Sequence, residues 1–157
     1  MKIAVVSDLH LEMGYIELPG GADVLIIAGD AAEARNVSKH HHSTKLKSDK
    51  PNHDFACSEF WRYEVAKYPK VFYVMGNHEH YHSKYTETLG ILKYIVPENV
   101  TILENSYEEY NGVVFMGATL WTDLNRGDPV TAYELKQNMN DYHMITHKDR
   151  WGYHKLR

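Results

Sequence analysis

Residues 75–80 read MGNHEH and gather several groups that could do chemistry. They follow KVFYV, an apolar run of β-branched and aromatic residues that is typical of a buried strand. The amide oxygen of Asn77 can serve as a metal ligand, and the imidazole of His78 can bind a metal ion or transfer a proton. A buried strand that ends in this way indicates a functional site.

Two earlier segments carry the same kinds of group. SDLH contributes Asp8 and His10, and GD contributes Asp30. Asp8 and His10 are two residues apart, so in an extended chain both side chains leave on one face and can share one ion or two adjacent ions. Gly29 and Gly76 each precede a candidate ligand, where they let the backbone turn sharply and approach a bound group closely.

Three buried strands would position these segments. They are predicted at 2–7, 23–29 and 70–76, as short apolar runs that end in polar or turn residues. In sheets whose strands are connected through helices, ligands bind at the carboxyl ends of the strands. Because the candidate residues follow all three ends, we expect them to meet at one rim of the sheet.

Helices and hairpins are predicted for much of the remaining chain. The helices are expected at about 55–68, 84–96 and 129–140, with Asp54 as the first cap, Pro97 ending the second, and Asp128 followed by Pro129 starting the third.

After the second helix the pattern is that of hairpins. A strand is predicted at 100–104, and the Asn111-Gly112 turn signal joins SYEEY to the run that begins at Val113. The polar residues 31–53 are expected to cross the surface. The order of elements predicts an α/β fold, with α+β character in its second part.

The composition limits the class of protein. With 157 residues, 43% of them hydrophobic, residues 1–157 are expected to form one domain. The net charge of −4 and the scattered Lys and Arg residues argue against a nucleic-acid binder. One cysteine, Cys57, excludes an intrachain disulfide, and no apolar run approaches the roughly 18 residues of a membrane span. We therefore expect a cytoplasmic protein without a membrane partner.

The motifs DLH, GD and GNHE, in this order, resemble those of the calcineurin-like metallophosphoesterase superfamily. The resemblance implies part of a four-layer αββα sandwich with a dinuclear metal site. By analogy, Asp8 and His10 would bind the first ion, Asp30 would bridge both, and Asn77 would bind the second. His78 would be the catalytic residue that contacts phosphate and protonates the leaving oxygen. The cofactors would be two divalent ions of Mn, Fe or Zn, with Mn favoured.

The second half of the family pattern is missing. The chain lacks the G-H-x-H motif, and MITH, which leads to His147, is only a weak candidate for a strand ending in a ligand. We therefore expect an incomplete domain without its C-terminal half. Its exposed apolar surface would favour a homo-oligomer.

Three readings of the function stay open. The chain could be a phosphoesterase whose missing ligands are replaced, a catalytically silent remnant that binds metal or phosphate, or an interaction protein. GDAAEAR departs from the G-D-x-V-D-R-G of protein phosphatases and symmetrical dinucleotide hydrolases, so a small phosphomonoester, a phosphodiester or a nucleotide is the expected substrate. Nucleic acid is less favoured.

Other histidines and one glutamate have simpler interpretations. The chain has 11 histidines, and most histidines of any protein lie on its surface. His80 and His82 are expected at the rim of the site, and the triplet His40, His41 and His42 in a solvated loop. Glu79 is expected to orient its loop.

Overall fold

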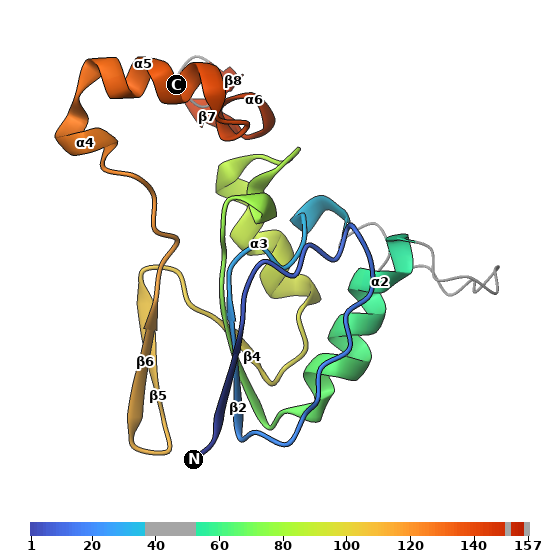
Figure 1. The fold of residues 1–157 in the computed structure, drawn as a ribbon. Coiled ribbons are helices and arrows are strands. Elements are labelled where there is room, and N and C mark those ends of the chain that lie inside the picture. The colour runs from blue at the N-terminus through green and yellow to red at the C-terminus, as the bar shows by residue number, and fades with distance from the viewer. Residues whose placement is uncertain (37–52, 150–151, 156–157) are drawn as a thin grey trace.

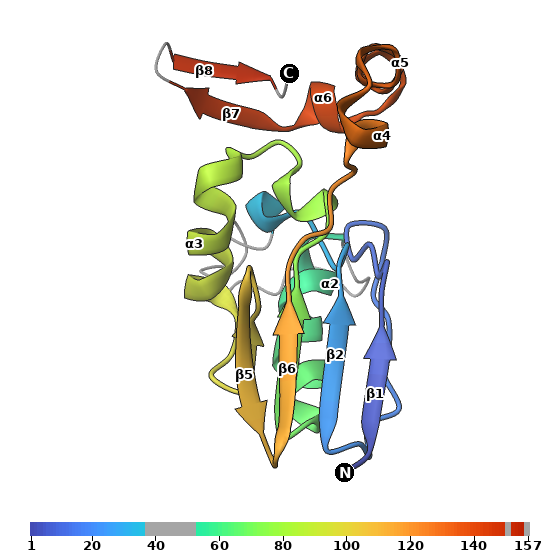
Figure 2. The same ribbon diagram turned by 90° about the vertical axis from the view of Figure 1, so that its left-hand side faces the viewer.

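A four-stranded parallel sheet forms the centre of the protein (Figures 1 and 2). The structure is a computed structural model that describes residues 1–36, 53–149 and 152–155. The strands lie in the order β1 (Ile3–Val6), β2 (Val24–Ala28), β3 (Lys70–Val74) and β4 (Val100–Ile102). The three predicted buried strands are confirmed. Assigning 100–104 to the hairpins is wrong, because Val100 and Ile102 pack into the main core and β4 pairs parallel with β3.

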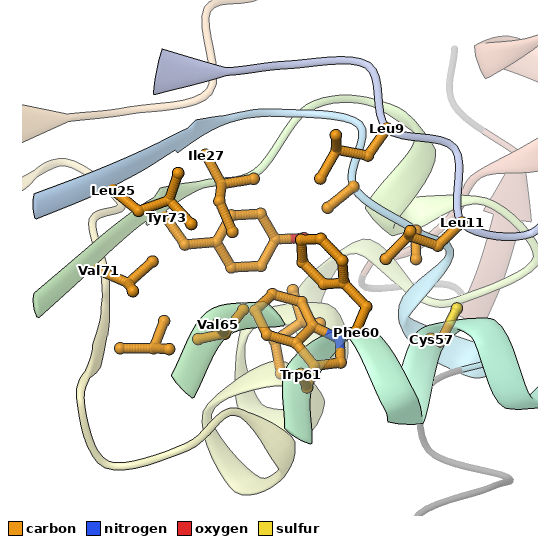
Figure 3. Close-up of a cluster of buried hydrophobic side chains, with 14 of the residues drawn as sticks. Leu9, Leu11, Leu25, Ile27, Cys57, Phe60, Trp61, Val65, Val71 and Tyr73 are labelled. Carbon is orange, nitrogen blue, oxygen red and sulfur yellow. The ribbon is translucent and has the colours of Figure 1, made fainter. Parts of the chain in front are cut away.

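Helices cover one face of this sheet. A helical stretch runs through α2 (His53–Glu59), a π-helix at Phe60–Glu64 and a 3-10 helix at Val65–Lys67. The helix α3 (Tyr85–Ile95) follows β3 on the same side (Figure 1). Figure 3 shows Phe60 and Trp61 from this stretch packed towards the sheet residue Tyr73. The predicted helices are confirmed, except that the first begins at His53, before the expected cap Asp54.

A β-hairpin lies over the opposite face of the sheet (Figure 2). Strands β5 (Ser106–Tyr110) and β6 (Val113–Gly117) pair antiparallel around Asn111 and Gly112, whose φ angles are 52° and 75°. Positive φ at both turn positions is the type I′ geometry that the Asn-Gly signal predicts. Phe115 stacks on Phe72 of β3 at 4.2 Å, which begins a second layer of packing.

The last part of the chain lies beyond the carboxyl ends of the parallel strands (Figures 1 and 2). It contains α4 (Leu124–Gly127), α5 (Pro129–Asn138), α6 (Asp141–Met144), β7 (Thr146–Asp149) and β8 (Gly152–Lys155). Backbone bonds from His82 N to Met144 O, at 2.9 Å, and from Thr146 N to Ser83 O, at 3.2 Å, attach it to the loop after GNHE.

Details of this segment test two predictions. Asp128 caps α5 by accepting a bond from Thr131 N at 2.7 Å, as predicted. The weak candidate for a strand ending at His147 does not hold, because His147 is the second residue of β7, which pairs antiparallel with β8.

Most of the predicted excursion at 31–53, including His40, His41 and His42, lies outside the described residues. Within the described ranges, none of the helices has the length and apolar character needed to cross a membrane.

Glu79 ties the carboxyl ends of two strands together. It lies in a 3-10 turn at His78–His80 and its side chain is fully buried. Its carboxylate accepts hydrogen bonds from the Tyr73 hydroxyl at 2.6 Å and from the backbone N–H groups of Gly76, at 2.7 Å, Ala31, at 2.7 Å, and Asp30, at 3.2 Å. We call this the Glu79 network. It fits the expectation that Glu79 orients its loop.

Burial and the network act in opposite directions on the charge of Glu79. Burial raises the pKa of the Glu79 carboxyl, while its hydrogen bonds to Tyr73 and to backbone N–H groups lower it. A buried carboxylate needs such donors to offset its lost hydration.

We expect Glu79→Gln to destabilise the fold by about 2 kcal/mol, because the introduced NH2 group turns hydrogens towards buried donors and leaves one unsatisfied. Urea unfolding would measure the change. Glu87→Gln, on exposed α3 surface, is the matched control and should change stability by less than about 0.5 kcal/mol. Equal effects of the two substitutions would contradict the structural role of the network.

His80 is buried, which corrects its expected position at the rim. Only 2% of the residue is exposed, because the 3-10 turn directs it beneath α3, where its ring stacks on Tyr85 at 4.6 Å. Neither ring nitrogen has a hydrogen-bond partner among the described residues. His82 keeps its expected rim position, with 41% of its side chain exposed beside Glu33.

We expect His80 to make stability pH-dependent. Burial lowers the pKa of His80 to about 4 from an ordinary value of 6.5. The unfolded chain therefore binds this proton at a higher pH than the folded chain. The contribution of neutral, buried His80 to the free energy of unfolding is fully present above about pH 6.5. It falls as the pH drops towards 4, by about 3 kcal/mol.

Urea unfolding at pH 7 and pH 4.5 would measure this loss. In His80→Phe the ring can still stack on Tyr85 but cannot titrate, so acidification should cost that variant less than it costs the wild type. His82→Gln should behave like the wild type. If acidification destabilised His80→Phe as much as the wild type, His80 would not be the group that causes the loss of stability.

Candidate metal centre

The first motif does not lie in extended chain. β1 ends at Val6, and Asp8 and His10 have φ angles of 53° and 44°, in the left-handed region. The expectation that both side chains leave an extended chain on one face is therefore wrong. Such backbone costs about 1–2 kcal/mol at each residue other than glycine. Bonds from Asp8 N to Gly29 O, at 3.1 Å, and from His10 N to Asp30 O, at 3.0 Å, hold the loop in this form.

Two glycines make room for Asp30. Gly29 has a φ of 92°, and a Cβ on Gly76 would lie 2.1 Å from Asp30 Oδ1. The two strand ends therefore approach more closely than side chains would allow, as the sequence predicted. Asp30, with a φ of 52°, accepts a hydrogen bond from the backbone N–H of His78 at 3.0 Å.

Three of the predicted site residues converge on one point. Potential ligand atoms of His10, Asp30 and His78 all lie within 4.8 Å of one another. Asp8 and Asn77 line a pocket of about 470 Å³ beside Asp30. All five predicted residues therefore lie at the same rim. The carboxylate of Asp8 accepts a bond from the Ser7 hydroxyl at 2.5 Å and does not belong to the converging group.

Glu12 is a site residue that the sequence reasoning missed. Its Oε1 lies 3.1 Å from Nδ1 of both His10 and His78, whose rings meet edge to face at 4.4 Å. With Nδ1 engaged, Nε2 of each imidazole is left for a metal ion or a substrate. The available signal was spacing, because Glu12 follows His10 by two residues, as His10 follows Asp8.

The donor set suits a divalent cation. Oε2 of Glu12 is buried and has no hydrogen-bond partner among the described residues, so this site holds unused acceptor capacity. Within the described ranges, the residues lining the pocket include three aspartates, Asp8, Asp30 and Asp141, and neither lysine nor arginine. Imidazole and carboxylate ligands at this spacing match the preferences of Mn, Fe and Zn.

Residues that follow β6 complete the wall of the pocket. Thr119 and Trp121 follow β6, and Met139 and Asp141 come from the region of α5 and α6. Trp121 is 41% exposed, so part of its ring is free to contact a bound molecule. Nothing local in the sequence marks Asp141 as a pocket residue.

Comparisons with known proteins show the family of the chain. The family model described as calcineurin-like phosphoesterase matches residues 1–152. An uncharacterised protein of Acanthamoeba polyphaga mimivirus is 30% identical over 148 residues, which are 89% of this chain and 50% of that protein.

A solved structure resembles the fold. It is a phosphopantetheinyl hydrolase from Mycobacterium tuberculosis, with a TM-score of 0.52 and 18% identity over 92% of this chain and 54% of that one. The chain thus spans about half the length of these two proteins. The family match covers nearly all of the chain, including every predicted site residue, and the chain belongs to the calcineurin-like phosphoesterase family.

Proposed function

We propose that the chain carries the metal- and phosphate-binding part of a phosphoesterase that hydrolyses a phosphomonoester or phosphodiester at two divalent ions. The observation that carries the proposal is the convergence of His10, Asp30 and His78 at the ends of three parallel strands. Asp8 and His10 would hold the first ion, Asp30 both ions and Asn77 the second. Mn²⁺ is the favoured metal, with Fe and Zn as the alternatives.

The residues of the chain would hold the metal ions in position and would supply a proton to the leaving oxygen. Bound divalent ions would neutralise phosphate charge and activate water. In its doubly protonated form, His78 would keep Nδ1–H on the Glu12 carboxylate and donate the proton of Nε2 to the leaving oxygen. Asp30 would keep its orientation through the N–H of His78 and the space left by Gly76.

The second candidate is a binding protein without turnover. Its support is that the converging group contains no further histidine within the described part of the chain: His143 and His147 do not belong to it. A site with fewer ligands than the family pattern would still attract phosphate and metal, but it would hold them less tightly.

The proposed substrate is a small phosphoester or a nucleotide. Thr119, Trp121 and Met139 offer a partly apolar wall next to the predicted ligands, which suits an organic group attached to the phosphate. The chain is a single unit in this proposal, and a reducing cytoplasm is its proposed compartment, because Cys57 is the single cysteine of the sequence.

Substitutions of Asp30 and His78 distinguish a metal ligand from a residue that acts as a general acid. Asp30→Ala should abolish Mn²⁺ binding and hydrolysis together, because a bridging carboxylate is shared by both ions. His78→Ala should keep Mn²⁺ binding nearly unchanged and slow turnover by about 10²- to 10⁴-fold. Calorimetry with Mn²⁺ and hydrolysis of an aryl phosphate would measure the two effects.

Asp23→Ala, at the other end of β2, and His82→Ala are the matched controls. Equal Mn²⁺ binding by wild type and Asp30→Ala would overturn the dinuclear site. Because His78 lies within the converging group, loss of Mn²⁺ binding in His78→Ala would make it a ligand. Metal binding without turnover in the wild type would favour the second candidate.

Self-association is also a proposal. Ile3 and Val5 of β1 are 41% and 63% exposed, and Tyr107 and Met116 of the hairpin are 74% and 77% exposed. We expect a dimer or larger species at micromolar concentration, because pairing would cover such apolar side chains. Sedimentation velocity would detect it, and Val5→Glu with Met116→Glu should shift the chain towards the monomer. A wild-type monomer would exclude the proposal.

A further inference from the structure

Tyr81 lies between the predicted ligand Asn77 and the last part of the chain, from α4 to β8, which we call the late segment. It is 6% exposed, and its hydroxyl accepts a hydrogen bond from Nδ2 of Asn77 at 3.1 Å. Its ring stacks on the imidazole of His78 at 4.3 Å, with an angle of 27° between the planes. One side chain thus contacts both residues that follow Gly76.

Asp141 approaches the same hydroxyl from α6. Burial raises the pKa of Tyr81, and the Asp141 carboxylate raises it further through its charge and as a hydrogen-bond acceptor. Asp141 is 5% exposed, lines the pocket beside Asn77, and has an Oδ1 without a partner among the described residues. The backbone bonds of the loop at His82 and Ser83 to the late segment hold α6 in place.

The hydroxyl has one proton, and a carboxylate can only accept. With this proton directed towards the negative charge of Asp141, the hydroxyl oxygen accepts from Nδ2 of Asn77, in the bond of 3.1 Å. The NH2 group of Asn77 must then face Tyr81, so its carbonyl oxygen turns away from the hydroxyl. We propose that Tyr81, supported by Asp141, fixes the amide of Asn77 with its oxygen towards the metal site.

This inference rests on the proposed function and gives Tyr81 the role of a positioning residue. An unconstrained amide can rotate by half a turn and present two hydrogens to a cation instead of an oxygen. A carboxylate at the same position would not need this control, because both of its ends are acceptors. The late segment would thereby serve the metal centre through a hydrogen bond, without supplying a ligand.

Tyr81→Phe removes the hydroxyl and keeps the ring that stacks on His78. Calorimetry with Mn²⁺ on the whole chain should show the ion held by Asn77 bound about 10- to 100-fold more weakly, with the first ion little changed. Asp141→Ala should shift the affinity in the same direction. Tyr107→Phe, on the exposed face of the hairpin, is the matched control and should bind like the wild type.

A second background distinguishes orientation from general packing. In Asn77→Asp, the Tyr81→Phe substitution should weaken Mn²⁺ binding by less than about 3-fold, because a carboxylate needs no fixed orientation. A role in packing alone would give equal losses in both backgrounds and would overturn the inference.

The metal-free chain offers an independent measurement. Side-chain amide protons of Asn77 should give a distinct pair of NMR signals with slow solvent exchange, and Tyr81→Phe and Asp141→Ala should both speed that exchange at least about 10-fold. Unchanged exchange would overturn the inference. A wild type with the slow exchange but without Mn²⁺ binding would overturn the proposed metal function and leave the orientation of Asn77 established.

Discussion

The site depends on a buried carboxylate that joins the ends of two parallel strands. Glu79 takes hydrogen bonds from Tyr73 and Gly76 at the end of β3 and from Asp30 and Ala31 at the end of β2. These donors offset the hydration that the carboxylate loses in the core. Because the backbone of Asp30 is bound directly, the position of this predicted bridging ligand follows from a residue in the turn after the neighbouring strand.

Backbone strain collects around this point. Asp8, His10 and Asp30 all adopt the left-handed conformation, which costs free energy at residues other than glycine. Hydrogen bonds between the first and second loops compensate for it. Gly29 and Gly76 let the loops approach closely, so the ligands converge without any regular element passing through the site. The parallel sheet provides the rigid base that such loops need.

The later elements of the chain form part of the pocket at the carboxyl ends of the sheet. β5 and β6 cover part of one face of the sheet, and the chain after them lies across the carboxyl ends of the strands (Figure 2). There Trp121 and Asp141 join the pocket, and the hydroxyl of Tyr81 accepts a hydrogen bond from the amide of Asn77. The chain spans about half the length of the mimivirus protein and of the phosphopantetheinyl hydrolase.

The sequence by itself determined the features that depend on residues close together along the chain. Apolar runs ending in ligand-type residues marked the rim, Asn111-Gly112 marked the hairpin, and Asp128 marked a helix start. Tertiary structure decided the left-handed loop at Asp8, the burial of His80 and the parallel pairing of β4. It alone brought Glu12 to His78 and Asp141 to Tyr81. The two pairs are 66 and 60 positions apart in the sequence, and local periodicity carries no information about such separations.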